Sequence, residues 1–248
     1  MPEDLESILQ NWPYDPGSVQ VRAIVGDDGR SKLQLRLDLG LLQMETTGRP
    51  DGQRPLGCES LLEHYEKLSK RAEKEGCLAL FKLKLEDCLK LQQEAIQYHH
   101  RYLAFFQLQN FASVIADAER NLRLLDFIFQ HAETPEMATT FQQFRPYVLM
   151  MLTRARGTLA IQNEEYTLAL KHIEWGIHEI RAFLQANFPP ESVEQSPELH
   201  SLQSWFDEVK DQRPLTAREK LQKQMLDAVK NEDYERAARL RDALEELR

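Results

Sequence analysis

The sequence has few cysteines and no long apolar run. Only Cys58, Cys77 and Cys88 occur among the 248 residues, and no two of them have the short spacing of a metal-binding pair. This set indicates neither a disulfide framework nor a zinc site, and it favours a reducing compartment. No apolar stretch approaches the roughly 18 residues of a membrane-spanning helix, and the N-terminus lacks a basic and apolar signal segment. We therefore expect a cytoplasmic protein that is neither secreted nor inserted in a membrane.

The sequence also lacks the motifs of catalysis. Its seven histidines are scattered, and the one adjacent pair, His99-His100, cannot hold an ion from one helix face because neighbouring helical residues point about 100° apart. Neither a P-loop nor a Gly-x-Ser-x-Gly elbow is present. We expect a non-enzymatic protein without cofactor or metal. Because carboxylates are abundant, a ligand-binding or enzymatic site in a helical groove stays open as an alternative.

The sequence has fewer basic than acidic residues. The chain has 31 Lys and Arg against 40 Asp and Glu, which gives a formal net charge of −9. Nucleic acid affinity comes largely from basic residues that neutralise phosphates, and the basic clusters here are interleaved with acidic residues. We therefore expect no direct nucleic acid binding. The hydrophobic content of 42% is ordinary for a globular chain and is sufficient for a sizeable core.

Residues 1–57 have the pattern of a β-hairpin. Val19, Val21 and Ala23 alternate with other residues, and Gly26-Asp-Asp-Gly29 supplies turn chemistry after them. A second alternating run has one leucine at every other position: Leu33, Leu35, Leu37, Leu39 and Leu41. Two strands alone are marginal in water, so a helix, a further strand or a second copy must cover the leucine face.

The period becomes helical from residue 59 and predicts an all-helical body over residues 58–187. We expect helices near residues 59–76, 88–108, 111–130, 141–162 and 166–185, with a short extended segment within 78–85. Several prolines interrupt residues 188–214, which predicts a linker with one short amphipathic helix. Several aromatic and arginine residues of the body have two possible interpretations: Tyr102, Arg120, Arg123, Arg145 and Tyr147. One is that they line a groove between helices. The other is that the aromatic rings pack in the core and the arginine stems pack at its rim.

Three helix junctions share one scheme. Each has a polar turn followed by an aromatic residue, namely Phe111, Tyr166 or Tyr234. The scheme resembles the junction of a tetratricopeptide repeat, but the aromatic residues are 55 and 68 residues apart, whereas that repeat has a period of about 34. We predict antiparallel helix pairs with tetratricopeptide-like packing. The alternative is that any antiparallel helix pair converges on such turns.

Residues 215–248 predict a separate helical hairpin. Thr216 and Glu219 form a capping-box pattern, and residues 231–233 supply the turn between two amphipathic segments. In the second segment four residues share one face: Ala237, Leu240, Leu244 and Leu247. A hairpin of this size buries too little apolar surface to offset its chain entropy, so its outer face is expected to dock on another surface.

This hairpin resembles the UVR motif, also called the UvrB/UvrC motif. The matching residues are Leu221, Met225, Ala228, Tyr234, Ala237, Ala238, Leu240, Arg241 and Asp242. Val229 departs from the pattern, in which a second alanine is common. The resemblance implies a docking element of the kind found in nucleotide excision repair proteins, protease adaptors and many uncharacterised proteins. The wider chain is similar to an uncharacterised bacterial group of UVR-motif proteins, for which the resemblance implies no established activity.

These patterns lead to a mainly α protein that acts by protein recognition. We expect an adaptor whose hairpin docks on a partner helix pair or on its own copy. The residues expected to divide between the hairpin seam and the docking face are Leu221, Met225, Tyr234, Ala238, Leu240, Arg241, Asp242 and Leu244. An alternative is an accessory factor in nucleotide excision repair that engages DNA or the incision machinery.

Overall fold

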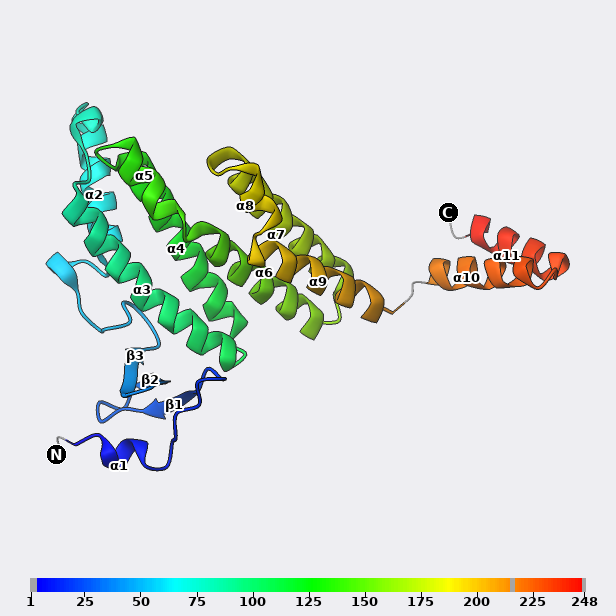
Figure 1. The fold of residues 1–248 in the computed structure, drawn as a ribbon, viewed down its shortest axis with the longest axis horizontal. Coiled ribbons are helices and arrows are strands. Elements are labelled where there is room, and N and C mark those ends of the chain that lie inside the picture. The colour runs from blue at the N-terminus through cyan, green and yellow to red at the C-terminus, as the bar shows by residue number, and fades with distance from the viewer. Residues whose placement is uncertain (1–3, 215–216, 247–248) are drawn as a thin grey trace. The chain divides into compact units, whose positions relative to one another are not determined.

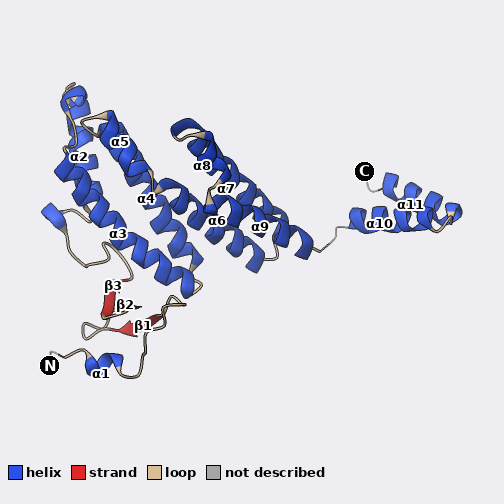
Figure 2. Cartoon of the chain, in the orientation of Figure 1, coloured by secondary structure: helices blue, strands red, loops and turns tan. Residues whose placement is uncertain are grey.

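The computed structural model describes residues 4–214 and 217–246, so Thr216 and Leu247 lie outside the described residues, as does the side chain of Glu219. Two compact units are present, Met1–Phe206 and Asp207–Arg248. Helices dominate both units, and a small antiparallel sheet lies near the N-terminus (Figures 1 and 2). The predicted fold class, a mainly α chain with an N-terminal β element and a C-terminal helical hairpin, is confirmed. None of the described helices has both the length and the apolar character needed to cross a membrane.

The N-terminal sheet has three strands, β1 (Val21–Val25), β2 (Ser31–Leu37) and β3 (Gly40–Glu45), in the order β1-β2-β3. The predicted hairpin is present as β1 and β2, with Gly29 at a positive φ of 74° in its turn. The prediction that the leucine run continues through residue 41 as one strand is wrong. A turn at residues 38–39 starts a third strand, and Leu39 is 91% exposed. The Arg36 guanidinium donates to the carbonyl of Gly40 at 2.8 Å and so holds this turn.

Helix α3 (Leu85–Gln107) covers the apolar face of the sheet. In the register of β2 and β3, Leu33 lies opposite Met44 and Leu35 lies opposite Leu42. Leu33, Leu35 and Met44 are buried in one cluster with aromatic residues of α3, including Tyr102 and Phe105. Of the covers that the sequence left open for the leucine face, the structure uses a helix, and the third strand extends the sheet beside β2.

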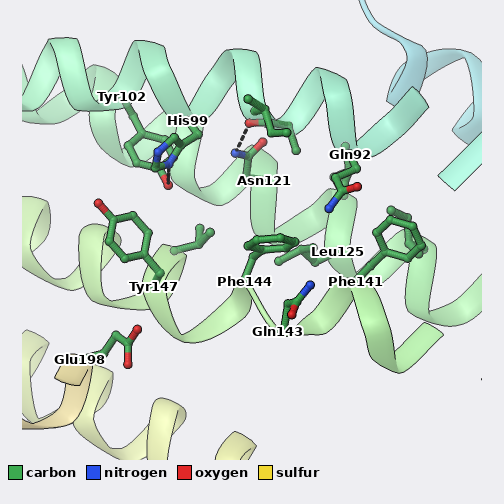
Figure 3. Close-up of a pocket in the computed structure, with 15 residues that line it drawn as sticks. Gln92, His99, Tyr102, Asn121, Leu125, Phe141, Gln143, Phe144, Tyr147 and Glu198 are labelled. Atoms are coloured by element: carbon green, nitrogen blue, oxygen red, sulfur yellow. Dashed lines mark hydrogen bonds between the residues drawn. The ribbon is translucent and has the colours of Figure 1, made fainter. Parts of the chain in front are cut away.

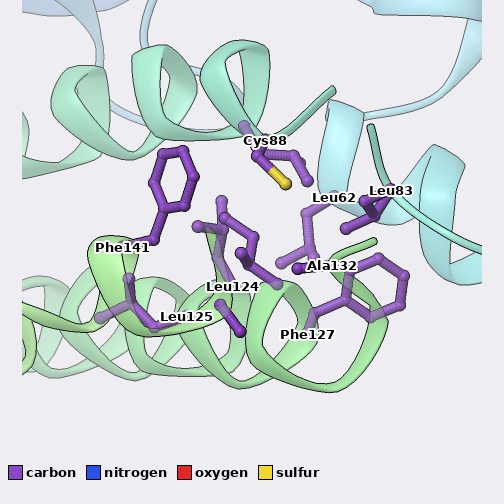
Figure 4. Packing of buried hydrophobic residues seen from close by; sticks show 11 residues of the cluster. Leu62, Leu83, Cys88, Leu124, Leu125, Phe127, Ala132 and Phe141 are labelled. Carbon is purple, nitrogen blue, oxygen red and sulfur yellow. The ribbon is translucent and has the colours of Figure 1, made fainter. Parts of the chain in front are cut away.

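The body is built from helices α2 to α9. Their bounds are α2 Leu61–Lys74, α4 Phe111–His131, α5 Pro135–Gln142, α6 Arg145–Gln162, α7 Tyr166–Asn187, α8 Pro190–Glu194 and α9 Pro197–Gln212, with a short α1 at Glu6–Leu9 and 3₁₀ turns at Pro55–Gly57 and Leu78–Leu80. Helices α3, α4, α6 and α7 pack in sequence order, α3 on α4, α4 on α6 and α6 on α7. One core cluster joins α2, α3, α4 and α5 (Figure 4).

Two local predictions for the body differ from the structure. The helix expected over residues 141–162 is divided between α5 and α6, because Pro146 has no amide hydrogen and occupies the first turn of a new helix. The segment 78–85, expected as extended, contains a 3₁₀ turn at Leu78–Leu80. Only Leu83 in it makes an isolated β-bridge, to Ala132.

Three helix junctions have one backbone geometry. The second residue of each turn has a positive φ of 58–61°, at Gln109, Glu164 and Glu232. Each of these amides donates three residues back, and the next amide donates five residues back. This bonding satisfies the last carbonyls of the preceding helix. The three junctions that share a sequence pattern therefore also share one turn conformation.

The segment 188–214, expected as a linker with one short helix, contains α8 and α9. Within the first unit, Leu199 and Leu202 of α9 are buried. Trp205 lies against α6 at Gly157, where a Cβ would come within 2.5 Å of the indole ring. Glycine at this position is therefore what permits α9 to approach α6 closely.

Candidate functional site

The C-terminal hairpin consists of α10 (Ala217–Lys230) and α11 (Tyr234–Glu246), which run antiparallel. Its seam is centred on Ala228 and Ala237, which are 5% and 9% exposed. Four of the residues predicted for partner binding are half-buried on the same helical stripes: Leu221, Met225, Leu240 and Leu244. They form the seam of the hairpin itself. The small alanines at its centre permit close approach of the two backbones.

An exposed apolar face lies beside this seam. Leu226, Val229 and Tyr234 are 58%, 46% and 67% exposed, and Ala238 is also exposed. At 3.6 residues per turn, Leu226 and Val229 occupy one flank of α10, and Tyr234 and Ala238 occupy the corresponding flank of α11. Because the helices are antiparallel, the two flanks form a single face. We call the face made by these four residues the hairpin face.

Arg241 and Asp242, the polar residues predicted to give specificity, are both exposed. The Arg241 guanidinium contacts the Asp242 carboxylate at 2.8 Å, and the two side chains are each 64% exposed. An exposed ion pair of this kind contributes little to stability. At 3.6 residues per turn, Arg241 lies one turn beyond Ala238 on the same flank of α11.

Leu226 is a residue of the hairpin face that sequence reasoning missed. The stripe predicted for the first helix of the hairpin contains Leu221, Met225, Ala228 and Val229, and Leu226 lies outside it. The placement of Val229 in this stripe is wrong, because it is 46% exposed. The available signal was a large apolar residue on a short helix whose buried stripe was already complete. Such a residue has no place in the seam of a two-helix hairpin and therefore remains at the surface.

A pocket of about 520 Å³ opens in the helical body between α3, α4, α5, α6 and the start of α9 (Figure 3). Its wall is largely apolar, with Leu124, Ile128, Phe141 and Val148 all buried. Two of the aromatic residues expected in a helical groove, Tyr102 and Tyr147, line it. The arginines expected there pair elsewhere instead: Arg120 with Glu94, Arg123 with Glu66, and Arg145 with Asp126.

His99 is a titratable group of this pocket whose pKa is strongly lowered. Its Nδ1 atom lies 2.8 Å from the hydroxyl oxygen of Tyr102, which is completely buried. Burial, helped by the neighbouring His100, lowers the pKa of His99 to about 4, so the imidazole is neutral at neutral pH. Burial, with a smaller effect of Glu198, raises the pKa of Tyr147. The Tyr147 ring lies 5.6 Å from that of His99.

Two buried ion pairs lie between α3 and α4 and serve the fold. Arg101 makes two bonds to Asp117, at 2.7 and 2.8 Å, and also donates to the carbonyls of Glu45, the last residue of β3, and of Gly48. Glu94, completely buried, pairs with Arg120. Its carboxylate also accepts from the amides of residues 61 and 62, the free donors at the start of α2. These pairs attach the sheet and α2 to the central helices.

The described residues offer no arrangement typical of a metal site. Among them, no group of three or more His, Cys, Asp and Glu side chains is placed to hold an ion. Cys88, a buried residue of α3, has its pKa raised to about 11 by burial, which keeps the thiol protonated and unreactive at neutral pH.

Comparison with known proteins identifies one segment. The family described as the UvrB/uvrC motif matches residues 217–248, the segment of α10 and α11. Neither a curated protein nor a solved structure matches the chain. The resemblance of the C-terminal hairpin to the UVR motif is therefore confirmed. The match covers residues 217–248 and does not extend to the body.

Proposed function

We propose that this protein is a non-enzymatic adaptor that binds another protein through the hairpin face. The occupant in this proposal is a second helical hairpin, from a partner that carries a UVR-type motif or from another copy of this chain. UVR motifs mediate protein–protein interactions in repair proteins, and the motif here coincides with α10 and α11. The single observation that carries the proposal is the exposure of three large apolar side chains on one face of this hairpin.

The energetics of the hairpin support docking. Two alanines are its only buried residues among those whose side chains the structure describes, so the seam removes little apolar surface from water. Covering Leu226, Val229 and Tyr234 with a second helix pair would complete a four-helix bundle around a shared core. Large, rigid tyrosine side chains frequently anchor such interfaces. Arg241 would supply a polar contact at the rim.

A quantitative binding experiment tests the proposal with the full chain. The purified chain is first analysed by sedimentation equilibrium, and tagged chain is then used to recover partners from a lysate, with recovery quantified by mass spectrometry. Leu226→Glu and Tyr234→Glu each place a charge on the hairpin face, and we expect at least about a tenfold loss of association. A chain that ends at Arg213 is expected to lose it completely.

Gln224→Glu is the matched control. It adds the same charge to the same helix at an exposed position on the opposite flank, and association is expected to be unchanged. Equal partner recovery and equal self-association by the full chain and the chain ending at Arg213 would overturn the proposal. So would equal losses in Leu226→Glu and Gln224→Glu.

A further inference from the structure

The pocket in the helical body has the size and character of a small-molecule site. Its volume of about 520 Å³ lies within the range of roughly 300–1,000 Å³ that is usual for such sites. Helices far apart in the sequence form it, and the structure packs them around it as one unit, so the walls are preformed. The accessible wall is mostly apolar and includes Ile96 and Phe144, which are 41% and 45% exposed. Phe141 also lines the pocket and is labelled in Figure 3.

The pocket has few polar groups, and its lining contains neither lysine nor arginine. Among the 15 residues that line it, Glu198 is the one that carries a formal charge at neutral pH. The Ser196 hydroxyl donates a hydrogen bond to its carboxylate at 2.8 Å. His99 is neutral, because burial lowers its pKa to about 4. An anionic group would therefore be repelled here, whereas a cation would be attracted.

Aromatic faces lie in the same pocket as this carboxylate. Phe144 is 45% exposed, and Tyr147 and His99 line the wall with it (Figure 3). Burial raises the pKa of the Tyr147 phenol, and the negative charge of Glu198 adds a smaller effect in the same direction. Ammonium groups bind well where aromatic faces and a carboxylate occur together, and partial desolvation strengthens both attractions.

We propose that this pocket binds a small amphiphile with an apolar body and a single ammonium head. The head lies beside Glu198 and Tyr147, and the body fills the space against Ile96, Phe141 and Phe144. This site is independent of the hairpin face, and neither depends on the other. No chemical step is involved, only binding.

The test uses three probes that share one alkyl chain: octyltrimethylammonium, octanol and octanoate. Each is titrated into the full chain by calorimetry and followed by methyl NMR. We expect octyltrimethylammonium to saturate one site and to bind about tenfold more tightly than octanoate. The largest methyl shifts are expected at Ile96, Leu125 and Val148, which line the pocket. Tighter binding of octanoate, an absence of saturable binding, or shifts confined to other methyl groups would overturn the proposal.

Matched variants locate the head group. Glu198→Gln keeps an acceptor for the Ser196 hydroxyl but removes the charge, and we expect it to abolish most of the preference for octyltrimethylammonium over octanoate while octanol binding is unchanged. Glu194→Gln makes the same charge change at an exposed position of α8 outside the pocket, and the preference is expected to persist. An equal effect of both variants would contradict the assignment. If Glu198→Gln fails to fold, the comparison of the three probes on the unaltered chain still tests the proposal.

Discussion

Two helical hairpins in this chain have the same turn, but the aromatic residue after the turn is buried in one and exposed in the other. Helices α3 and α4 are joined through Gln109 to Phe111, which is 5% exposed, whereas α10 and α11 are joined through Glu232 to Tyr234, which is 67% exposed. The sheet and α6 cover the first aromatic residue, but nothing in the described chain covers the second. The turn therefore defines a hairpin, and neighbouring elements determine whether that hairpin is core or surface.

The largest expected difference between the hairpins is at these two aromatic positions. Phe111→Ala removes a ring from a packed cluster, and we expect it to lower the free energy of unfolding by roughly 3–5 kcal/mol. Tyr234→Ala is expected to change it by less than about 0.5 kcal/mol, because the ring is exposed. Urea denaturation followed by circular dichroism measures both. Similar losses in the two variants would show that Tyr234 is buried in solution.

Breaking an ion pair is also expected to cost more stability in the hairpin of α3 and α4 than in the hairpin of α10 and α11. Asp117→Ala leaves the buried Arg101 without its carboxylate, and we expect a loss of about 3–5 kcal/mol. Glu235→Ala removes the partner of Arg239 in an exposed pair on α11, for which about 0.5 kcal/mol or less is expected. Thermal unfolding of both variants provides the measurement. A double variant, Arg101→Met with Asp117→Leu, is expected to recover much of the loss, because no buried charge then remains unpaired.

Acid is expected to act on the body through His99. Its folded pKa of about 4 lies below the ordinary value of 6.5, so in this window the unfolded chain binds more protons than the folded one. The resulting stability is present above pH 6.5 and is lost as the pH falls toward 4, by at most about 1.4 kcal/mol per pH unit. Denaturation series at several pH values measure the slope. His99→Gln should flatten it but not remove it, since burial also lowers the pKa of His100 and His131.

The smallest expected effect is common to both hairpins. Gln109 and Glu232 both have a left-handed φ, which side chains other than glycine adopt at a cost of about 1–2 kcal/mol. Gln109→Gly and Glu232→Gly are each expected to stabilise their own hairpin by less than about 1 kcal/mol, because the greater chain entropy of glycine offsets part of the gain. Hydrogen exchange of the flanking helices reports the change separately for each hairpin. A loss of protection in either variant would contradict the shared geometry.

Helical periodicity made most of the fold predictable. The aromatic residue after each polar turn located three junctions, and the motif residues located the C-terminal hairpin. The third strand was not predictable, because Leu39 and Leu41 continue the alternation and only the bonds from Arg36 show where the chain reverses. Local sequence has no signal for such a contact.

The candidate sites were predictable to different degrees. The hairpin seam followed from residue spacing, since its members lie within one short segment. The pocket could not be predicted, because His99, Tyr147 and Glu198 come from three different helices and approach one another only after folding. Glu94 and Asp117 look like surface carboxylates in the sequence. Their burial depends on Arg120 and Arg101, partners that helical spacing alone does not identify.

The carboxylate of Glu94 has a consequence for the order of folding. The first amides of α2 find their acceptor on α3, a residue 32 or 33 positions later in the chain. During synthesis α2 therefore leaves the ribosome before the group that anchors its start exists. We expect α2 to become fixed only after α3 has formed, so that Glu94→Gln accelerates unfolding and leaves the folding rate nearly unchanged. Stopped-flow kinetics would distinguish this late attachment from early formation of α2.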